Sequence, residues 1–297
     1  MISSESSLST GEKISGKVKA LFELVKFRLA SLVAFSGVFG YSLGAEAIDW
    51  PKLILFSLAA IGITGASNTI NQIIEKDLDK LMKRTANRPL PSGRLSVEES
   101  ILWAVFLGVT AMYIFLVYFN LTTALLALLS LILYGFVYTP LKRVGPIAVF
   151  VGAIPGAFPP MIGWIAATNQ FGLEPGILFA IQFFWQFPHF WAIAWVLDDD
   201  YKKAGFKLLP SQGGKDHRTT IQIMIYTLFL LPVGWLPFEL GMTDINSALV
   251  ATVCGVFFLA QTFHLMRKCS DKTAMQLMFG SFIYLPIVQI AFLLDKM

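Results

Sequence analysis

Asn71, Glu75 and Asp79 recur at four-residue spacing in a stretch that begins inside an apolar segment. On a helix this spacing places all three side chains on one face, turned by about 40° per step. Two carboxylates four residues apart repel each other, so a bound cation is the chemistry that would keep them together. Asp77 lies off that face and is expected to be solvated.

Fixed positive charges follow the acidic face within about three helical turns: Lys83, Arg84 and Arg88. Acidic groups that hold Mg2+, followed by cations that contact phosphate oxygens, are typical of sites that bind a diphosphate. The alternative is a helix end that passes into water, where charged residues are ordinary. Asn71 weighs against this alternative because it lies within the apolar run, where polar side chains are costly and usually face an interior site.

A second acidic run, Asp198-Asp199-Asp200, follows a later apolar segment. Three adjacent acids cannot all point the same way on a helix, so one or two are expected to reach a shared cation. Mg2+ accepts a few carboxylates together with water and substrate phosphates. Two sparse acidic clusters on one side of a membrane therefore favour one or two Mg2+ ions between them.

Two further pairs of residues have both a functional and a structural interpretation. Tyr138 and Lys142 end an apolar segment and could donate to a phosphate oxygen, although an aromatic beside positive charges is ordinary at a membrane interface. Trp185 and His189 lie within a later apolar segment. A histidine there could ligate a metal or bond to a neighbouring helix, and the aromatic surroundings suit a flat apolar ligand or plain packing.

The composition places these residues in an integral membrane protein. Of the 297 residues, 56% are hydrophobic and 14% are charged, against about 25% charged in soluble domains. Nine apolar segments are each long enough to cross about 30 Å of hydrocarbon: 27–45, 53–74, 101–119, 122–140, 147–167, 177–197, 221–241, 247–266 and 276–294. The two cysteines form no CxxC or CxxCH pattern, so neither a disulfide framework nor a covalent heme site is indicated.

The basic residues predict the orientation of the chain. Of the 23 Lys and Arg residues, only Lys52 and Lys296 lie outside the N-terminal segment and one alternating set of loops. The positive-inside rule then predicts a cytoplasmic N-terminus, an outer C-terminus, and both acidic runs on the cytoplasmic side. The polar residues 1–20 are predicted to be a disordered cytoplasmic tail, and 21–297 a single domain.

The pattern Asn71-x-x-x-Glu75-x-x-x-Asp79 resembles the NxxxDxxxD motif of the UbiA superfamily of intramembrane prenyltransferases. Within it, the stretch 71–88 looks like that of the protoheme IX farnesyltransferases. Three further blocks agree: 138–143, 156–164, and 185–191 followed by 199–210. Glu75 departs from the usual Asp, and the acidic run of 198–200 departs from the spaced DxxxD of other UbiA enzymes.

The resemblance implies a nine-helix bundle around a central cavity, in which farnesyl diphosphate and heme b react with the help of Mg2+. The farnesyl group would pass to a vinyl group of heme b through an allylic cation and give heme O. The implied metal-binding and catalytic residues are Asn71, Glu75, Asp79, Asp199 and Asp200. The implied diphosphate contacts are Arg28, Lys83, Arg84, Arg88, Tyr138, Lys142 and Arg143, and the implied heme contacts are His189 and Trp185.

The resemblance also implies a place in the cell. The expected location is the bacterial cytoplasmic membrane, with lipid around the bundle, the site on the cytoplasmic side and no nucleic acid as a partner. The product would pass to heme A synthase or to a terminal oxidase assembly.

Two other functions fit part of the pattern. A UbiA-type prenyltransferase could act on an aromatic or quinone precursor instead of heme. A heme or lipid carrier is a rival of a different class. Transporter sites usually lie near the bilayer midplane, whereas the acidic residues of this chain lie at the predicted cytoplasmic edge.

Overall fold

The computed structural model describes residues 10–211 and 214–297, with side chains from Ile14 onward. In this part of the chain, nine helical segments are long and apolar enough to cross a membrane, which confirms the all-α polytopic fold expected from hydropathy. The spans are α2 (Phe27–Gly44), α3 (Trp50–Asp79), α4 (Val97–Tyr118), the segment Leu121–Leu141, α7 (Ile147–Thr168), α8 (Leu173–Val196), α10 (His217–Glu239), α11 (Ile245–Lys268) and α12 (Asp271–Leu294).

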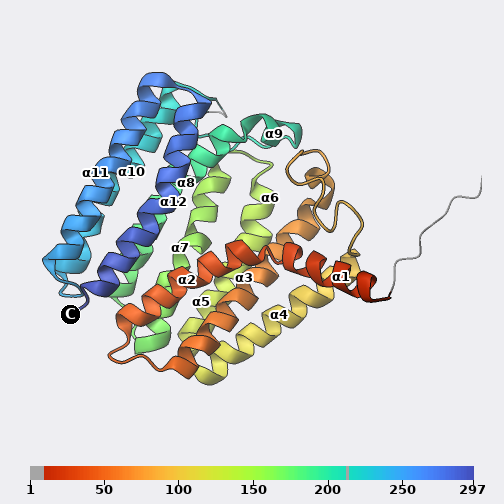
Figure 1. Ribbon diagram of the computed structural model, residues 1–297, viewed down its shortest axis with the longest axis horizontal. Coiled ribbons are helices and arrows are strands. Elements are labelled where there is room, and N and C mark those ends of the chain that lie inside the picture. Colours follow the sequence, from red (N-terminus) through yellow and green to blue (C-terminus); the bar gives the residue numbers. More distant parts are fainter. Residues whose placement is uncertain (1–9, 212–213) are drawn as a thin grey trace, which may run out of the picture.

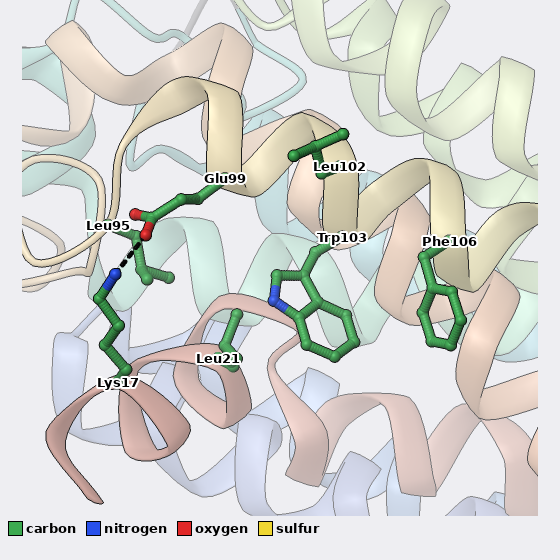
Figure 2. Close-up of a pocket in the computed structure, with 7 residues that line it drawn as sticks. All are labelled: Lys17, Leu21, Leu95, Glu99, Leu102, Trp103 and Phe106. Carbon is green, nitrogen blue, oxygen red and sulfur yellow. Dashed lines mark hydrogen bonds and ion pairs between the residues drawn. The ribbon is translucent and has the colours of Figure 1, made fainter. Parts of the chain in front are cut away.

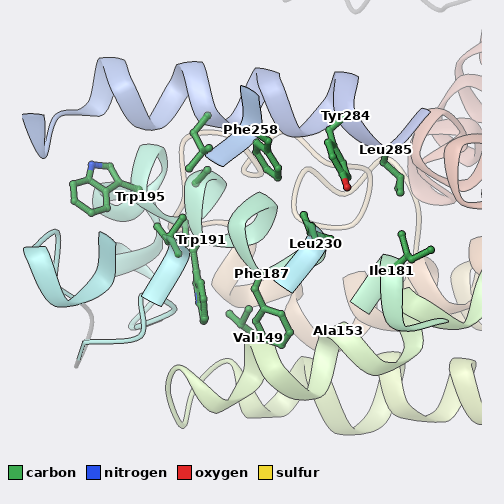
Figure 3. Packing of buried hydrophobic residues seen from close by; sticks show 14 of the residues in the cluster. Val149, Ala153, Ile181, Phe187, Trp191, Trp195, Leu230, Phe258, Tyr284 and Leu285 are labelled. Atoms are coloured by element: carbon green, nitrogen blue, oxygen red, sulfur yellow. The ribbon is translucent and has the colours of Figure 1, made fainter. Parts of the chain in front are cut away.

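The spans form two groups that meet at α7 (Figure 1). On one side α7 contacts α2 and α5, and α3 packs between α2 and α4. On the other side α7 contacts α8, which contacts α10 and α12, and α11 packs against both of these. Figure 3 shows Phe187 and Trp191 of α8 beside Val149 of α7 in the buried cluster of the second group.

Small residues let α2 and α7 approach closely. A Cβ atom on Gly40 would overlap the carbonyl oxygen of Pro160, and one on Gly163 would overlap that of Gly37. Helix pairs in membranes are stabilised by such close packing, because the hydrophobic effect does not distinguish a neighbouring helix from lipid. This crossing fixes α2, and with it the segment that leads into α2, against the centre of the bundle.

The helix that bears the acidic face is longer than its apolar run. α3 has 30 residues, or about 45 Å of helix, and extends beyond the predicted segment 53–74. Its last turns therefore carry Glu75 and Asp79 past about 30 Å of hydrocarbon toward one end of the bundle. At its other end, Asp49 caps the helix by accepting from the Lys52 backbone N–H.

The span Leu121–Leu141 changes its winding before it ends. It consists of α5 (Leu121–Ile132), the π-helix η1 (Leu133–Tyr138) and the short α6 (Thr139–Leu141). The hydroxyl of Thr139, the first residue of α6, donates to the carbonyl of Tyr134 in η1 at 2.9 Å. Such single π turns are frequent at functional sites.

A helix also precedes the first span. α1 (Thr10–Leu24) occupies much of the segment predicted as a disordered tail over residues 1–20. The prediction is corrected for residues 10–20, because Ala20 and Leu24 are buried against the loop before α4. Residues 1–9 lie outside the described part of the chain.

Another short helix, α9 (Asp198–Lys203), follows α8. Figure 1 shows it at the same end of the bundle as the loop that follows α3. Both acidic runs of the sequence therefore lie at one end of the molecule.

Candidate active site

The polar face of α3 lies inside the protein. Asn71, Glu75 and Asp79 are 1%, 3% and 0% exposed. Buried carboxylates are costly unless opposite charges accompany them. The structure supplies such charges from segments that are distant in the sequence.

Two predicted phosphate-binding residues pair with the α3 carboxylates. Lys142, directly after α6, places its Nζ 2.9 Å from Glu75 Oε1 and donates to Oε2 at 3.1 Å. Arg88, in the loop after α3, donates from Nη1 to Asp79 Oδ2 at 2.7 Å. The structure thus brings these two cations to the acidic face predicted to hold the metal.

Lys26 completes this cluster, although it is not among the residues that the sequence predicted for the site. Its backbone has φ 51°, a left-handed conformation that is uncommon outside glycine. The turn separates α1 from α2, and the Lys26 ammonium donates to Asn71 Oδ1 at 3.1 Å. Asn68 supports the turn by donating to the Val25 carbonyl at 3.1 Å. The one feature of the sequence that could have indicated Lys26 as a site residue is its position directly before an apolar segment.

Positive charge is concentrated around Lys26. Burial, the Arg88 guanidinium and the Lys142 ammonium lower the pKa of Lys26 well below its ordinary range, whereas Glu75 and Asp79 act in the opposite direction. An anion with several oxygens would relieve the repulsion among the three cations. The arrangement is therefore suited to a diphosphate.

The α3 carboxylates also fit the implied metal. Among the described residues, Asp79 Oδ1 and Glu75 Oε1 are buried and accept no hydrogen bond, although the Lys142 ammonium lies close to the latter oxygen. Carboxylate oxygens without a donor are the ligands that Mg2+ prefers. In the described part of the chain, no group of three or more His, Cys, Asp or Glu side chains is arranged to hold a metal.

The three acids of α9 have different surroundings. Asp198 is 4% exposed and forms an ion pair of 2.6 Å with Lys202. Asp199 is exposed. Of the two acids predicted to bind metal, Asp199 and Asp200, only Asp200 has partners that connect it to the α3 side of the site.

Asp200 binds the backbone of the loop that carries Arg88. Its Oδ1 accepts from the Lys83 N–H at 2.9 Å and its Oδ2 from the Arg84 N–H at 3.1 Å. Desolvation acts to raise the pKa of Asp200, but the Arg84 and Lys83 N–H groups and the Lys203 ammonium outweigh it and hold that pKa below its ordinary value. Asp200 therefore joins α9 to the loop after α3.

The other predicted diphosphate residues differ in position. The side chains of Lys83 and Arg84 are exposed, although their backbone lies beside Asp200. Arg28 and Arg143 are also exposed. Arg28 lies in the first turn of α2, after the left-handed residue Lys26, and its exposed side chain is not directed to the α3 face by that turn.

Tyr138 forms one wall of the site. The Lys142 ammonium lies 4.7 Å from the centre of the Tyr138 ring, a cation–π contact. Beside this ring is a cavity of about 70 Å3 that also borders Phe190 and Tyr201. Gly152 makes room for the ring, because a Cβ atom there would lie 2.6 Å from it.

His189 and Trp185 lie deeper, on α8. Their rings stack with centroids 4.5 Å apart, and His189 Nδ1 lies 2.8 Å from the Ser281 hydroxyl of α12. That hydroxyl donates to the Met278 carbonyl, so Nδ1 must act as the donor and Nε2 keeps its lone pair. Among the described residues, no partner hydrogen bonds to Nε2 of His189.

The family of the chain follows from a match to a family model. Residues 33–285 match the model of the UbiA prenyltransferase family. The chain belongs to the UbiA prenyltransferase family. The UbiA match includes α3, Lys142, α8 and α9, and it begins after Lys26.

A curated relative matches this UbiA protein over nearly its whole length. The protoheme IX farnesyltransferase of Cytophaga hutchinsonii is 56% identical over 284 residues, which cover 95% of this chain and 99% of that protein. Because the identity is high across nearly the full length of both chains, this relative says more about the protein than a shared fold would.

Solved structures share the UbiA fold at low sequence identity. A digeranylgeranylglyceryl phosphate synthase structure matches with a TM-score of 0.79 at 20% identity, covering 94% of this chain and 98% of that chain. A UbiA homologue from Archaeoglobus fulgidus, bound to GPP and Mg2+, matches with a TM-score of 0.62 at 17% identity, covering 92% and 99%. At these identities the likeness shows the fold.

Proposed function

We propose that the protein transfers the farnesyl group of farnesyl diphosphate to a vinyl group of heme b and so produces heme O. The observation that carries the proposal is the 56% identity, over nearly the full length of both chains, to a protein named protoheme IX farnesyltransferase. The site supports it, because three cations surround a buried acidic face at one end of a membrane bundle. The overall reaction consumes one water and releases diphosphate.

The residues of the site divide into two roles. Asn71, Glu75 and Asp79 would hold Mg2+ together with Asp200, and Asp199 is a weaker candidate because its side chain is exposed. When bound, Mg2+ neutralises charge on the diphosphate.

The cations would bind the other oxygens of the leaving group. Lys26, Arg88 and Lys142 already lie within contact of the acidic face, and fixed charges of this kind stabilise negative charge that develops as a bond breaks. The Tyr138 hydroxyl is a further donor. Four other basic residues have exposed side chains: Lys83, Arg84, Arg28 and Arg143. They would attract the diphosphate electrostatically more than contact it once it is bound.

The heme would lie on the α8 side of the site. His189 lies seven residues before the end of α8, about 10 Å into the bundle. Its free Nε2 lone pair is a suitable axial ligand for iron, and Trp185 would stack beside it. Aromatic side chains around the reaction site would keep water from an allylic cation until the new carbon–carbon bond has formed.

The expected setting is the bacterial cytoplasmic membrane, with the charged end of the bundle on the cytoplasmic side. The positive-inside distribution of Lys and Arg supports this orientation. A product that stays in the membrane would pass to heme A synthase or to a terminal oxidase assembly.

A direct assay tests the proposal. Purified protein in lipid nanodiscs is supplied with Mg2+, farnesyl diphosphate and heme b, and the products are identified by mass spectrometry. Heme O and diphosphate are expected in equal amounts. Absence of heme O, with a known active enzyme as the positive control, would overturn the proposal.

Two further arms of the assay separate the rival functions. Prenylation of 4-hydroxybenzoate in place of heme would assign the protein to the branch that acts on aromatic precursors. Binding of heme with no Mg2+-dependent release of diphosphate would favour a carrier.

A further inference from the structure

α1 has an apolar face that the described part of the protein does not cover. Ile14, Val18 and Phe22 recur every fourth residue and are 60%, 48% and 53% exposed. At this spacing they occupy an arc of about 80° on the helix. Ser15 and Lys19, also exposed, lie on the next arc around the helix and form a polar face.

The opposite side of α1 is attached to the bundle. Ala20 and Leu24 are 1% and 0% exposed and pack with Leu90 and Leu95. The helix therefore cannot turn its free apolar face inward without losing this contact. Among the residues that the structure describes, none covers Ile14, Val18 and Phe22.

A groove runs between α1 and the first turns of α4. Its volume is about 350 Å3, within the range of ligand sites. Figure 2 shows Leu21 of α1 facing Trp103 of α4, with the Lys17–Glu99 ion pair at one end and Phe106 toward the other. The residues that line this α1–α4 groove are Lys17, Leu21, Leu95, Glu99, Leu102, Trp103 and Phe106.

The groove continues into the lipid-facing surface of the spans. Leu102, Val105 and Val109 of α4 are 70%, 57% and 63% exposed, as expected for a span in contact with hydrocarbon. At the other end of α1, the rings of Phe22 and Phe27 pack edge to face, with their centroids 5.3 Å apart. Phe27 is the first residue of α2. The free face of α1 is thus continuous with two membrane-spanning helices.

We propose that α1 lies in the membrane–water interface and that the α1–α4 groove holds one acyl chain of a phospholipid from the adjacent leaflet. Amphipathic helices with one apolar and one charged face bind in this manner. The apolar floor of the groove fits an acyl chain. Lys17, which pairs with Glu99 but remains 63% exposed, lies at the mouth of the groove, where a headgroup phosphate could also reach its ammonium. Trp103 is the residue type typical of this depth in a bilayer.

This placement of α1 bears on the candidate site. The carbonyls of Leu24 and Val25, at the end of α1, accept from Gln72 and Asn68 of α3. The next residue is Lys26, whose ammonium binds Asn71. A lipid that holds α1 against α4 would therefore also hold Lys26 at the acidic face.

A nitroxide scan of α1 tests the interfacial position without disturbing the packed face. Cys254 and Cys269, the two native cysteines, are replaced by serine, and single labels are placed at positions 15, 18, 19 and 22 of the full chain in lipid nanodiscs. Labels at Val18 and Phe22 should collide more with oxygen than with a water-soluble nickel chelate, and labels at Ser15 and Lys19 should show the reverse. Equal access of the nickel chelate to all four positions would overturn the proposal. Exclusion of both reagents from Val18 and Phe22, which contact with a second protein copy would cause, would also overturn it.

The acyl-chain site has its own test. Protein is extracted from phosphatidylethanolamine and phosphatidylglycerol bilayers into detergent, and the phospholipids retained per chain are counted by native mass spectrometry. The groove-filling variant Leu21→Trp should retain one phospholipid fewer than the unaltered chain, and Val105→Trp, which adds the same ring outside the groove, should retain the same number. Equal retention in Leu21→Trp and the unaltered chain would overturn the proposal.

Discussion

Each polar residue of the α3 face has a cation from a different part of the chain. Glu75 has Lys142 at 2.9 Å, Asp79 has Arg88 at 2.7 Å, and Asn71 is held by Lys26. A buried pair of this kind adds little net stability in comparison with apolar packing. Its presence in a membrane bundle is better explained by what the charges do for a ligand.

Replacement of Asp79 by Asn tests the metal role. The variant keeps the size of the side chain and an acceptor for Arg88, but loses the negative charge of the free Oδ1. Turnover should fall by about 100-fold or more, measured as heme O formed at saturating Mg2+. Asp77→Asn, at an exposed position, is the matched control and should retain activity. Equal activity of the two variants, with unchanged thermal unfolding, would contradict the metal assignment.

A second pair of variants compares Lys26 with Arg28, which the sequence resemblance favoured. Lys26 reaches the acidic face at Asn71, whereas the side chain of Arg28 is exposed. Lys26→Met should raise the KM for farnesyl diphosphate by about 10-fold or more, since a hydrogen bond to a charged group contributes about 1.5–3 kcal/mol. Arg28→Met should change it less. Steady-state kinetics at constant heme separate the two, and the reverse order would favour Arg28, the diphosphate contact predicted from sequence.

His189 is the third residue whose role can be tested. His189→Ala should weaken heme binding and shift the Soret band of bound heme, because the free Nε2 is the atom available to iron. His264, on α11 and exposed, serves as the control. An unchanged spectrum and affinity in His189→Ala would assign the residue to its hydrogen bond with Ser281.

At the scale of the elements, the site depends on segments that close around the end of α3. The π segment η1 ends at Tyr138 and leads to Thr139, whose hydroxyl accepts from Asn71 Nδ2 at 3.1 Å. The loop after α3 returns Arg88 to Asp79, and α9 holds that loop through Asp200. The loop after α3 and the short helix α9 lie outside the candidate spans, whereas η1 lies near the end of the span Leu121–Leu141.

The attachment of α9 to this loop is testable by hydrogen exchange. Asp200→Ala removes the acceptor of the Lys83 and Arg84 N–H groups, so these two amides should exchange faster in the variant. Asp199→Ala, at the exposed neighbour, should leave them unchanged. Equal protection in all three proteins would show that Asp200 does not anchor the loop and would leave metal binding as its main role.

These elements also mark the limit of prediction from sequence. Hydropathy located the spans because the bilayer requires about 20 apolar residues for each crossing, and the four-residue spacing of Asn71, Glu75 and Asp79 located the acidic face. The position of Lys26 depends on one left-handed residue, and the winding of η1 has no hydropathy signature. Both features depend on the packing of segments that are distant in the sequence.

The case of α1 has a similar explanation. Its serine and glycine residues are typical of disordered segments, but Ala20 and Leu24 find partners in the loop before α4. That contact joins residues about 70 positions apart, as the pairing of Arg94 with Glu23 also does (71 positions). Local composition carries no information about such partners.

At the scale of the whole molecule, the number of spans sets the relation between the two termini. If each of the nine candidate spans in the described part of the chain crosses once, the segment before α2 and the end of α12 lie on opposite sides of the membrane. The charged end with α9 and the loop after α3 shares the side of the segment before α2. The positive-inside distribution predicts that this side is the cytoplasm.

Labelling of single cysteines in intact cells tests this orientation. In a chain whose native cysteines are replaced by serine, Asn169→Cys and Met297→Cys should react with a membrane-impermeant maleimide, because they lie at the end opposite the candidate site. Asn87→Cys and Lys207→Cys should react only after the membrane is opened. All four side chains are exposed, so a difference in labelling reports the side of the membrane and not burial. The reverse pattern would put the candidate site outside the cell, where cytoplasmic farnesyl diphosphate could not reach it without a separate carrier.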